Sequence, residues 1–217
     1  MTQRRLPGRR LLLGSIVVLI PIIAAIVYGA SQPNSPSATP KSWPTIVFDF
    51  DTGSPLLAAA QRTPFSQTAN GVTAQFSSSS DPAAFSVHSY DANGLKLSQF
   101  SGKYLYDNKT SSDILDIEFS TEIIEIKFTF ATVELQGGAI ILPSDIVLAA
   151  YKDTKLVGSS KTYGSFSSDS YPQGTLSFGS GLPFNWVRIS VPPKSSGATD
   201  FLVDNITVTT ISKSSTP

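Results

Sequence analysis

The sequence predicts an all-β fold: an antiparallel two-sheet β-sandwich of the jelly-roll kind, preceded by one N-terminal transmembrane or signal helix. From residue 45 onward, apolar residues alternate with polar ones, and no stretch sustains the apolar spacing of a helix. Turn-forming clusters such as Asn70-Gly71 and Gln136-Gly137-Gly138 separate the alternating runs. Roughly ten short strands with such turns favour facing antiparallel sheets over a parallel sheet, which needs helices between its strands.

The clearest alternation lies at residues 115–119 and 124–130, where Leu, Ile and Phe alternate with Asp, Glu, Lys and Thr. Each run predicts a strand with one buried and one exposed face, since successive side chains point to opposite sides. In the second run the residues predicted to be buried are Ile124, Ile126, Phe128 and Phe130. Runs at 72–76 and 187–191 show the same pattern. The remaining expected strands are 45–50, 84–89, 103–106, 146–151, 156–161, 175–178 and 201–209.

The first 44 residues predict a route to the cell surface. Residues 1–10 hold four arginines, and residues 11–28 are 18 residues without a charge. A helix of that length spans roughly 27 Å, enough for a bilayer core, and the arginines favour a cytoplasmic N-terminus. The rest of the chain is therefore expected outside, either membrane-anchored or secreted after signal cleavage. Residues 31–44, with four prolines, are predicted to be a linker. The sandwich is expected over 45–210 and a short tail over 211–217.

Composition excludes several classes of site and partner. The chain has no cysteine, which excludes disulfides, thiolate metal sites and a cysteine nucleophile, and its single histidine excludes a histidine-rich metal site. Without the four arginines, 12 basic residues face 16 acidic ones, so nucleic acid is not an expected partner. Glu118 and Glu125 belong to the outward phase of their strands, where charge normally serves solvation. No catalytic residue and no enzymatic activity are predicted.

Asp204 is out of place in the C-terminal stretch DFLVDNITVT. By alternation it shares a face with Leu202, Ile206 and Val208, which is the face that apolar residues bury. An uncompensated buried carboxylate is costly, so Asp204 needs a cation, hydrogen-bond donors or a bulge that turns it outward.

Several stretches resemble the jelly-roll β-sandwiches of exported bacterial and archaeal surface proteins, a group that overlaps the carbohydrate-binding-module and galactose-binding-like folds. The resemblance covers about residues 45–210 and rests on IVFDFDTG, TPFSQTANGVTAQFSS, IVLAAYKDTKLVGSS, NWVRISVP and DFLVDNITVT. It implies a structural calcium held between the first and last strands by backbone carbonyls and Asp204, with Asp49 or Asp51 contributing. The alternative is that Asp204 accepts backbone N–H bonds at a bulge and binds no metal.

Trp186 is the leading candidate for ligand binding, because it lies on the opposite phase from Val187, Ile189 and Val191. Exposed aromatic rings stack on the apolar faces of sugars, and nearby polar groups order the hydroxyls. Equally, Trp186 can cover a loop or pack at the edge of the sandwich. Further rings come from Tyr90, Tyr104, Tyr106, Tyr163 and Tyr171. The sequons at Asn108 and Asn205 are candidate glycosylation sites.

These features favour a non-catalytic extracytoplasmic cell-surface domain that binds glycan or cell-envelope polymer. The alternative is a structural or adhesive subunit that assembles with copies of itself into a surface layer or filament, for which an unpaired edge strand would be the sign. An envelope hydrolase ranks third, since it needs two carboxylates facing each other across a cleft.

Overall fold

The structure is a computed structural model that describes residues 43–91, 94, 96–108, 113–133, 144–166, 170–192, 198 and 200–211. The predicted helix at 11–28 lies outside these residues, as does most of the predicted linker and tail. Among the residues that the structure describes, no helix is long and apolar enough to cross a membrane.

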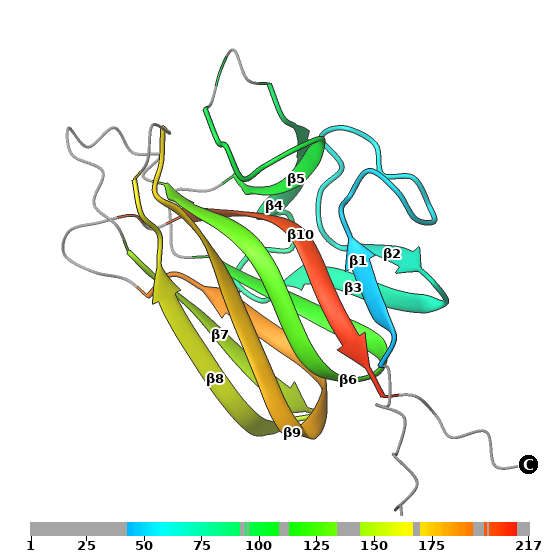
Figure 1. The fold of residues 1–217 in the computed structure, drawn as a ribbon. Coiled ribbons are helices and arrows are strands. Elements are labelled where there is room, and N and C mark those ends of the chain that lie inside the picture. Colours follow the sequence, from blue (N-terminus) through cyan, green and yellow to red (C-terminus); the bar gives the residue numbers. More distant parts are fainter. Residues whose placement is uncertain are drawn as a thin grey trace, which may run out of the picture. The chain divides into compact units, whose positions relative to one another are not determined.

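The described part of the chain forms antiparallel β-strands and no helix (Figure 1), so the predicted all-β antiparallel class is confirmed. The strand β2 was not predicted from the sequence. The strands are β1 (Thr45–Phe48), β2 (Phe65–Ala69), β3 (Val72–Ser78), β4 (Phe85–Ser89), β5 (Lys103–Asp107), β6 (Ile114–Val133), β7 (Asp145–Lys152), β8 (Lys155–Tyr163), β9 (Gln173–Ser190) and β10 (Asp200–Thr210).

The strands join in one hydrogen-bonded network, in the order β4-β5-β10-β6-β9-β7-β8, with β1 beside β10 and the β2–β3 hairpin beside β6. The long strands β6 and β9 pair along both of their halves, with register shifts between Glu118 and Glu125 of β6. Figure 1 shows both ribbons turning back on themselves at the lower end of the view, so that each continues in a second layer. The two layers are therefore joined through β6 and β9.

The main core lies between the layers and is rich in phenylalanine. Burying a side chain of this size stabilises the fold by roughly 1.5–3 kcal/mol relative to leaving it exposed. Several rings contact one another, as in the stacked pair Phe65 and Phe76, whose centroids are 5.0 Å apart. The fully buried phenylalanines are Phe48, Phe50, Phe76, Phe85, Phe128, Phe130, Phe184 and Phe201.

The bend in β6 corrects one prediction. Ile126, Phe128 and Phe130 are buried as expected, but Ile123 is fully buried in place of Ile124, which is only half-buried. The cause is the register shift between Ile123 and Glu125, which reverses the alternation of the strand.

A second reversal, in β10, answers the question raised by Asp204. Phe201 and Val203 belong to the main core, whereas Leu202 packs in a smaller cluster on the opposite side of the strand. The register with β6 shifts between Asp204 and Thr207, and Asn205 adopts a left-handed φ of 51°. Beyond this bulge Ile206 and Val208 face the main core. The prediction that Asp204 shares their face was therefore wrong, because the bulge intervenes.

Candidate functional site

Four side chains form a row across the outer face of one layer. Strand pairing places Gln75 of β3 opposite Glu118 of β6, Glu118 opposite Trp186 of β9, and Trp186 opposite Tyr151 of β7. The next residues along these strands are Phe76, Ile117, Val187 and Ala150, and all of them are buried in the main core. Because side chains alternate along a strand, the row points away from the core. The predicted outward phase of Trp186 agrees with this arrangement.

Aromatic rings meet at one end of the row. The rings of Tyr151 and Trp186 lie with centroids 4.4 Å apart and planes inclined by 30°. The guanidinium carbon of Arg188 lies 5.0 Å from the centroid of the Trp186 ring, and Arg188 Nε donates to Asp116 Oδ1 at 3.0 Å. Stacking and the cation–π contact hold the indole in place. The indole is therefore a positioned, half-exposed platform.

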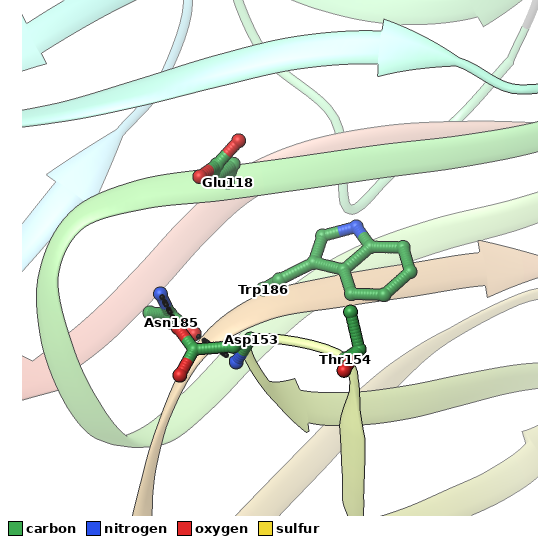
Figure 2. A pocket seen from close by; sticks show the side chains of 5 residues that line it. All are labelled: Glu118, Asp153, Thr154, Asn185 and Trp186. Atoms are coloured by element: carbon green, nitrogen blue, oxygen red, sulfur yellow. Dashed lines mark hydrogen bonds between the residues drawn. The ribbon is translucent and has the colours of Figure 1, made fainter.

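The turn between β7 and β8 forms a rim beside Trp186 (Figure 2). Asp153 N donates to Asn185 Oδ1 at 2.9 Å, and Asn185 Nδ2 donates to Asp153 Oδ1 at 3.3 Å. These two bonds tie the turn to β9, where Asn185 precedes Trp186. A hollow beside the turn and Trp186 has a volume of about 340 Å³. It is lined by Glu118, Asp153, Thr154, Asn185 and Trp186.

A second, smaller hollow continues from Glu118 toward β3. Its volume is about 150 Å³, and its lining is formed by Thr73, Gln75, Glu118, Phe119 and Ser120. Thr73 N donates to Ser120 Oγ at 2.9 Å, which ties β3 to β6. Glu118 is exposed, and no hydrogen bond or ion pair of its carboxylate is found within the described residues. The site thus combines a flat aromatic surface with open polar groups.

Asp204 lies in a different part of the fold and has no exposed surface. Its Oδ1 accepts from Asn205 N at 2.7 Å, and its Oδ2 accepts from Ser101 N at 3.2 Å and from Asn205 Nδ2 at 3.0 Å. Burial raises the pKa of Asp204 to about 7, because the charged form loses its hydration; the backbone donors oppose this and the charges of Asp51 and Asp49 add to it. The bulge and the backbone N–H bonds of the metal-free alternative are both present.

The other two predicted calcium ligands lie near this bulge. Asp49 Oδ1 accepts from Thr52 N at 2.8 Å and from Asp51 N at 3.1 Å, so it caps the turn that follows β1. Asp51 Oδ2 accepts from Lys103 N at 2.9 Å. Asp204 and Asp51 therefore hold the segment Ser101–Lys103 at both ends. Within the described residues, no group of three or more Asp, Glu, His or Cys side chains is close enough together to hold a metal ion.

The asparagines of both sequons use their amide nitrogens internally. Asn108 Nδ2 donates to Ala84 O at 3.0 Å, and Asn205 Nδ2 donates to Asp204 Oδ2. An N-linked glycan attaches to this nitrogen and replaces one of its two hydrogens. After glycosylation, each asparagine would keep a single N–H for the hydrogen bond that it now donates. Glycosylation at Asn108 and Asn205 stays a prediction.

The tyrosines proposed as further rings do not join Trp186. Tyr90, Tyr104, Tyr106 and Tyr171 pack in the smaller cluster around Leu202, and Tyr163 lies at the far end of β8, 67% exposed. Burial is the largest cause that raises the pKa of Tyr106 to about 12. The ring beside Trp186 is Tyr151, which the sequence analysis missed. It follows Val147 and Ala149 on the outward phase of its strand, so the argument made for Trp186 applies to it equally.

No family model matches the chain, and no match is found among curated proteins. The structure is similar to the K2 cleaved adhesin domain of Lys-gingipain, with a TM-score of 0.47 and 11% identity over 76% of this chain and 99% of that one. It is also similar to the carbohydrate-binding module TmCBM61 in complex with β-1,4-galactotriose (TM-score 0.39, 10% identity, 64% of this chain and 88% of that one). A third similar structure is the Agl-KA catalytic domain (TM-score 0.37, 9% identity, 72% of this chain and 30% of that one). An adhesin domain and a carbohydrate-binding module are thus among the similar structures, and carbohydrate-binding modules are one of the groups that the sequence resembles.

Proposed function

We propose that this chain is a non-catalytic, extracytoplasmic cell-surface domain that binds glycan or cell-envelope polymer on the outer face of β3, β6, β9 and β7. The observation that carries the proposal is the row Gln75, Glu118, Trp186 and Tyr151, in which an aromatic pair and open polar side chains share one exposed sheet face.

A sugar ring suits this site because it presents an apolar face and an edge of hydroxyl groups. The Trp186 platform takes the apolar face, while Glu118 and the Asp153–Asn185 rim accept and donate hydrogen bonds at the edge. Both hollows open to solvent and are not enclosed, so a sugar in the middle of a polymer can reach them as well as a chain end can.

The test measures binding of glycans to the full chain and to its Trp186→Ala variant. The only other tryptophan is Trp43, so in a Trp43→Phe background the fluorescence of Trp186 reports occupation of the site directly. Binding to the Trp186→Ala variant, which lacks this reporter, is measured by calorimetry beside the parent. We expect a saturable change with neutral or amino-sugar oligosaccharides. On Trp186→Ala we expect a loss of about fivefold or more in affinity, since such stacking contributes on the order of 1 kcal/mol or more. Tyr163→Ala removes an exposed ring away from the hollow and should bind normally. Unchanged binding by Trp186→Ala would refute the proposal.

A second candidate function is self-assembly, and the edge strand β8 favours it. The strands β4 and β8 stand at the two ends of the strand order. The outer side of β4 is covered, because segment 60–63 forms backbone hydrogen bonds with it. In the described residues β8 pairs only with β7, so its other side is an open edge. An open edge offers backbone groups to another strand. Lys155 and Lys161 lie at this edge, and charged edge residues are a common protection against such pairing, so self-assembly ranks below glycan binding.

We also propose a structural calcium beside Asp204, with Asp49 or Asp51 and backbone carbonyls completing an oxygen ligand set. The support is chemical: carboxylate oxygens suit calcium, and a cation would relieve the repulsion that Asp51 and Asp49 exert on the buried carboxylate. The ion would strengthen the junction between β1, β10 and the Ser101–Lys103 segment, away from the glycan site.

A further inference from the structure

The two hollows on the outer sheet face share one residue, Glu118. The larger hollow lies on the Trp186 side of Glu118 and the smaller one on the Gln75 side. Neighbouring strands lie about 4.8 Å apart, so the row from Trp186 across β6 to Gln75 spans roughly 10 Å, more than one sugar ring. A ligand that fills both hollows is therefore a chain that crosses β9, β6 and β3, with Glu118 at its middle.

The charge of this track is negative. Neither hollow is lined by lysine or arginine, while Glu118 and Asp153 both carry carboxylates. Arg188, beside the Trp186 ring, is paired with Asp116 at 3.0 Å, and Lys152, near the turn, is paired with Glu122. Arg188 and Lys152 are thus each paired with another carboxylate. Lys155, which follows Thr154, is exposed and lines neither hollow. The carboxylate of Glu118 has no partner among the described residues.

We infer that the ligand is an oligosaccharide or polymer of amino sugars with free amino groups, whose ammonium group is bound by Glu118 while a neighbouring ring stacks on Trp186. This inference rests on the proposed glycan-binding function and specifies its ligand class. An ammonium group forms a stronger hydrogen bond with the Glu118 carboxylate than a neutral hydroxyl does, because both groups are charged. The negative potential of the site repels uronic acids and sulfated sugars. Glu118 sets specificity, and Trp186 supplies affinity common to all sugars.

The experiment compares two ligands that differ only in charge: a short amino-sugar oligosaccharide and its N-acetylated form, of equal length and linkage. Both are titrated into the full chain carrying Trp43→Phe, in detergent, with fluorescence as the readout. We expect the free-amine form to bind about threefold to tenfold more tightly at low salt, the range for a partly exposed charged hydrogen bond. This preference should shrink as salt rises, because exposed charges are screened.

Glu118→Gln should abolish the preference, because it should weaken binding of the free-amine form more than binding of the N-acetylated form. The matched control is Glu125→Gln, an exposed glutamate beyond the bend of β6, which should keep the preference. For the second hollow, Gln75→Ala should weaken a trisaccharide more than a single sugar.

Several outcomes would overturn the inference: equal binding of the two ligands, a preference for the N-acetylated form, no binding of either, or a preference that survives Glu118→Gln. The proposed function is decided separately by Trp186→Ala. If that variant loses both ligands while the preference is absent, glycan binding stands and the choice of amino sugars fails. If it retains both ligands, the aromatic platform is not the site.

Discussion

Asp204 is a carboxylate enclosed by protein, with backbone donors for its oxygens and no cation beside it in the described residues. Its position follows from Asn205, because a left-handed residue at a bulge lets the strand reverse its phase within one step. Asparagine adopts this conformation more readily than most residues, and its side chain also donates to Asp204. The pair Asp204-Asn205 therefore acts as one unit that shapes the strand.

The raised pKa of Asp204 predicts a pH dependence of stability. The folded state holds the proton up to about pH 7, whereas the unfolded chain releases it near its ordinary value of about 4. The folded state thus binds more protons between these values, so the contribution of Asp204 is fully present at about pH 4 and is lost as the pH rises through about 7. With a chelator in the buffer to remove calcium, the free energy of unfolding should fall by an amount on the order of a few kcal/mol between pH 5 and pH 8.

Asp204→Asn supplies the control, because it keeps the size of the side chain but cannot ionise. The variant should lose this part of the pH dependence and remain folded but weaker, because its amide nitrogen cannot accept the N–H bonds that both oxygens of Asp204 accept. Calcium at pH 8 should stabilise the parent by roughly 2.7 kcal/mol at a hundredfold excess over Kd, and its melting temperature should rise accordingly. The melting temperature of the variant should not change. Identical melting temperatures of the parent in calcium and in chelator would exclude the metal. If the stability of the parent and of the variant depended on pH in the same way, the raised pKa of Asp204 would be excluded as the cause.

At the scale of the strand, alternation in the sequence predicted where most strands lie and which side chains they bury. It failed where a strand changes phase. The polar stretch Ser120–Glu122 interrupts β6, so the sequence shows two short runs in place of one strand of 20 residues. The same holds for β9, in which 175–178 and 187–191 read as separate strands. A bulge depends on how a strand meets its neighbours, and alternation within one segment does not contain that information.

Phe128 tests the assigned phase of the second half of β6. It has no exposed surface, lies opposite Leu176 of β9 and contacts the ring of Phe130. Phe128→Ala should lower the free energy of unfolding by roughly 3–5 kcal/mol, through lost burial and the cavity left behind. Lys127→Ala, on the exposed face of the same strand, should change it by less than about 0.5 kcal/mol. Chemical denaturation of both variants gives the comparison, and a change below about 1 kcal/mol for Phe128→Ala would mean that the faces are reversed.

At the scale of the whole domain, the candidate glycan site is assembled from four segments that are far apart in the sequence. Trp186 was predicted from its own strand, because its outward phase is visible in the alternation. Its neighbours were not, since strand order and register bring Tyr151 and Gln75 onto the same row. The hollow also needs the Asp153–Asn185 contact, which joins a turn to a strand more than 30 residues later. Such contacts follow from topology, and local pattern does not specify topology.

The open edge of β8 predicts how the domain behaves at high concentration. If the edge pairs with a second copy, sedimentation should show dimers or longer assemblies whose proportion rises with concentration. Replacing Ser159, near the middle of β8, with glutamate should then shift the distribution toward the monomer, because like charges meet across the new ladder. Ser66→Glu, on an exposed residue of β2, is the control. A monomer at all concentrations would exclude assembly through this edge.

The continuity of β6 and β9 through both layers also determines how the fold is lost. In a sandwich of separate sheets, one sheet can fray or detach while the other persists. Here each layer contains part of the same two strands, and pairing between them runs from Ile114 to Ala131 on β6. The layer that carries Trp186 and the layer that carries Asp204 therefore cannot separate unless a ladder common to both is broken. The domain should unfold in a single cooperative transition, in which amide protons of both layers become exposed to exchange together.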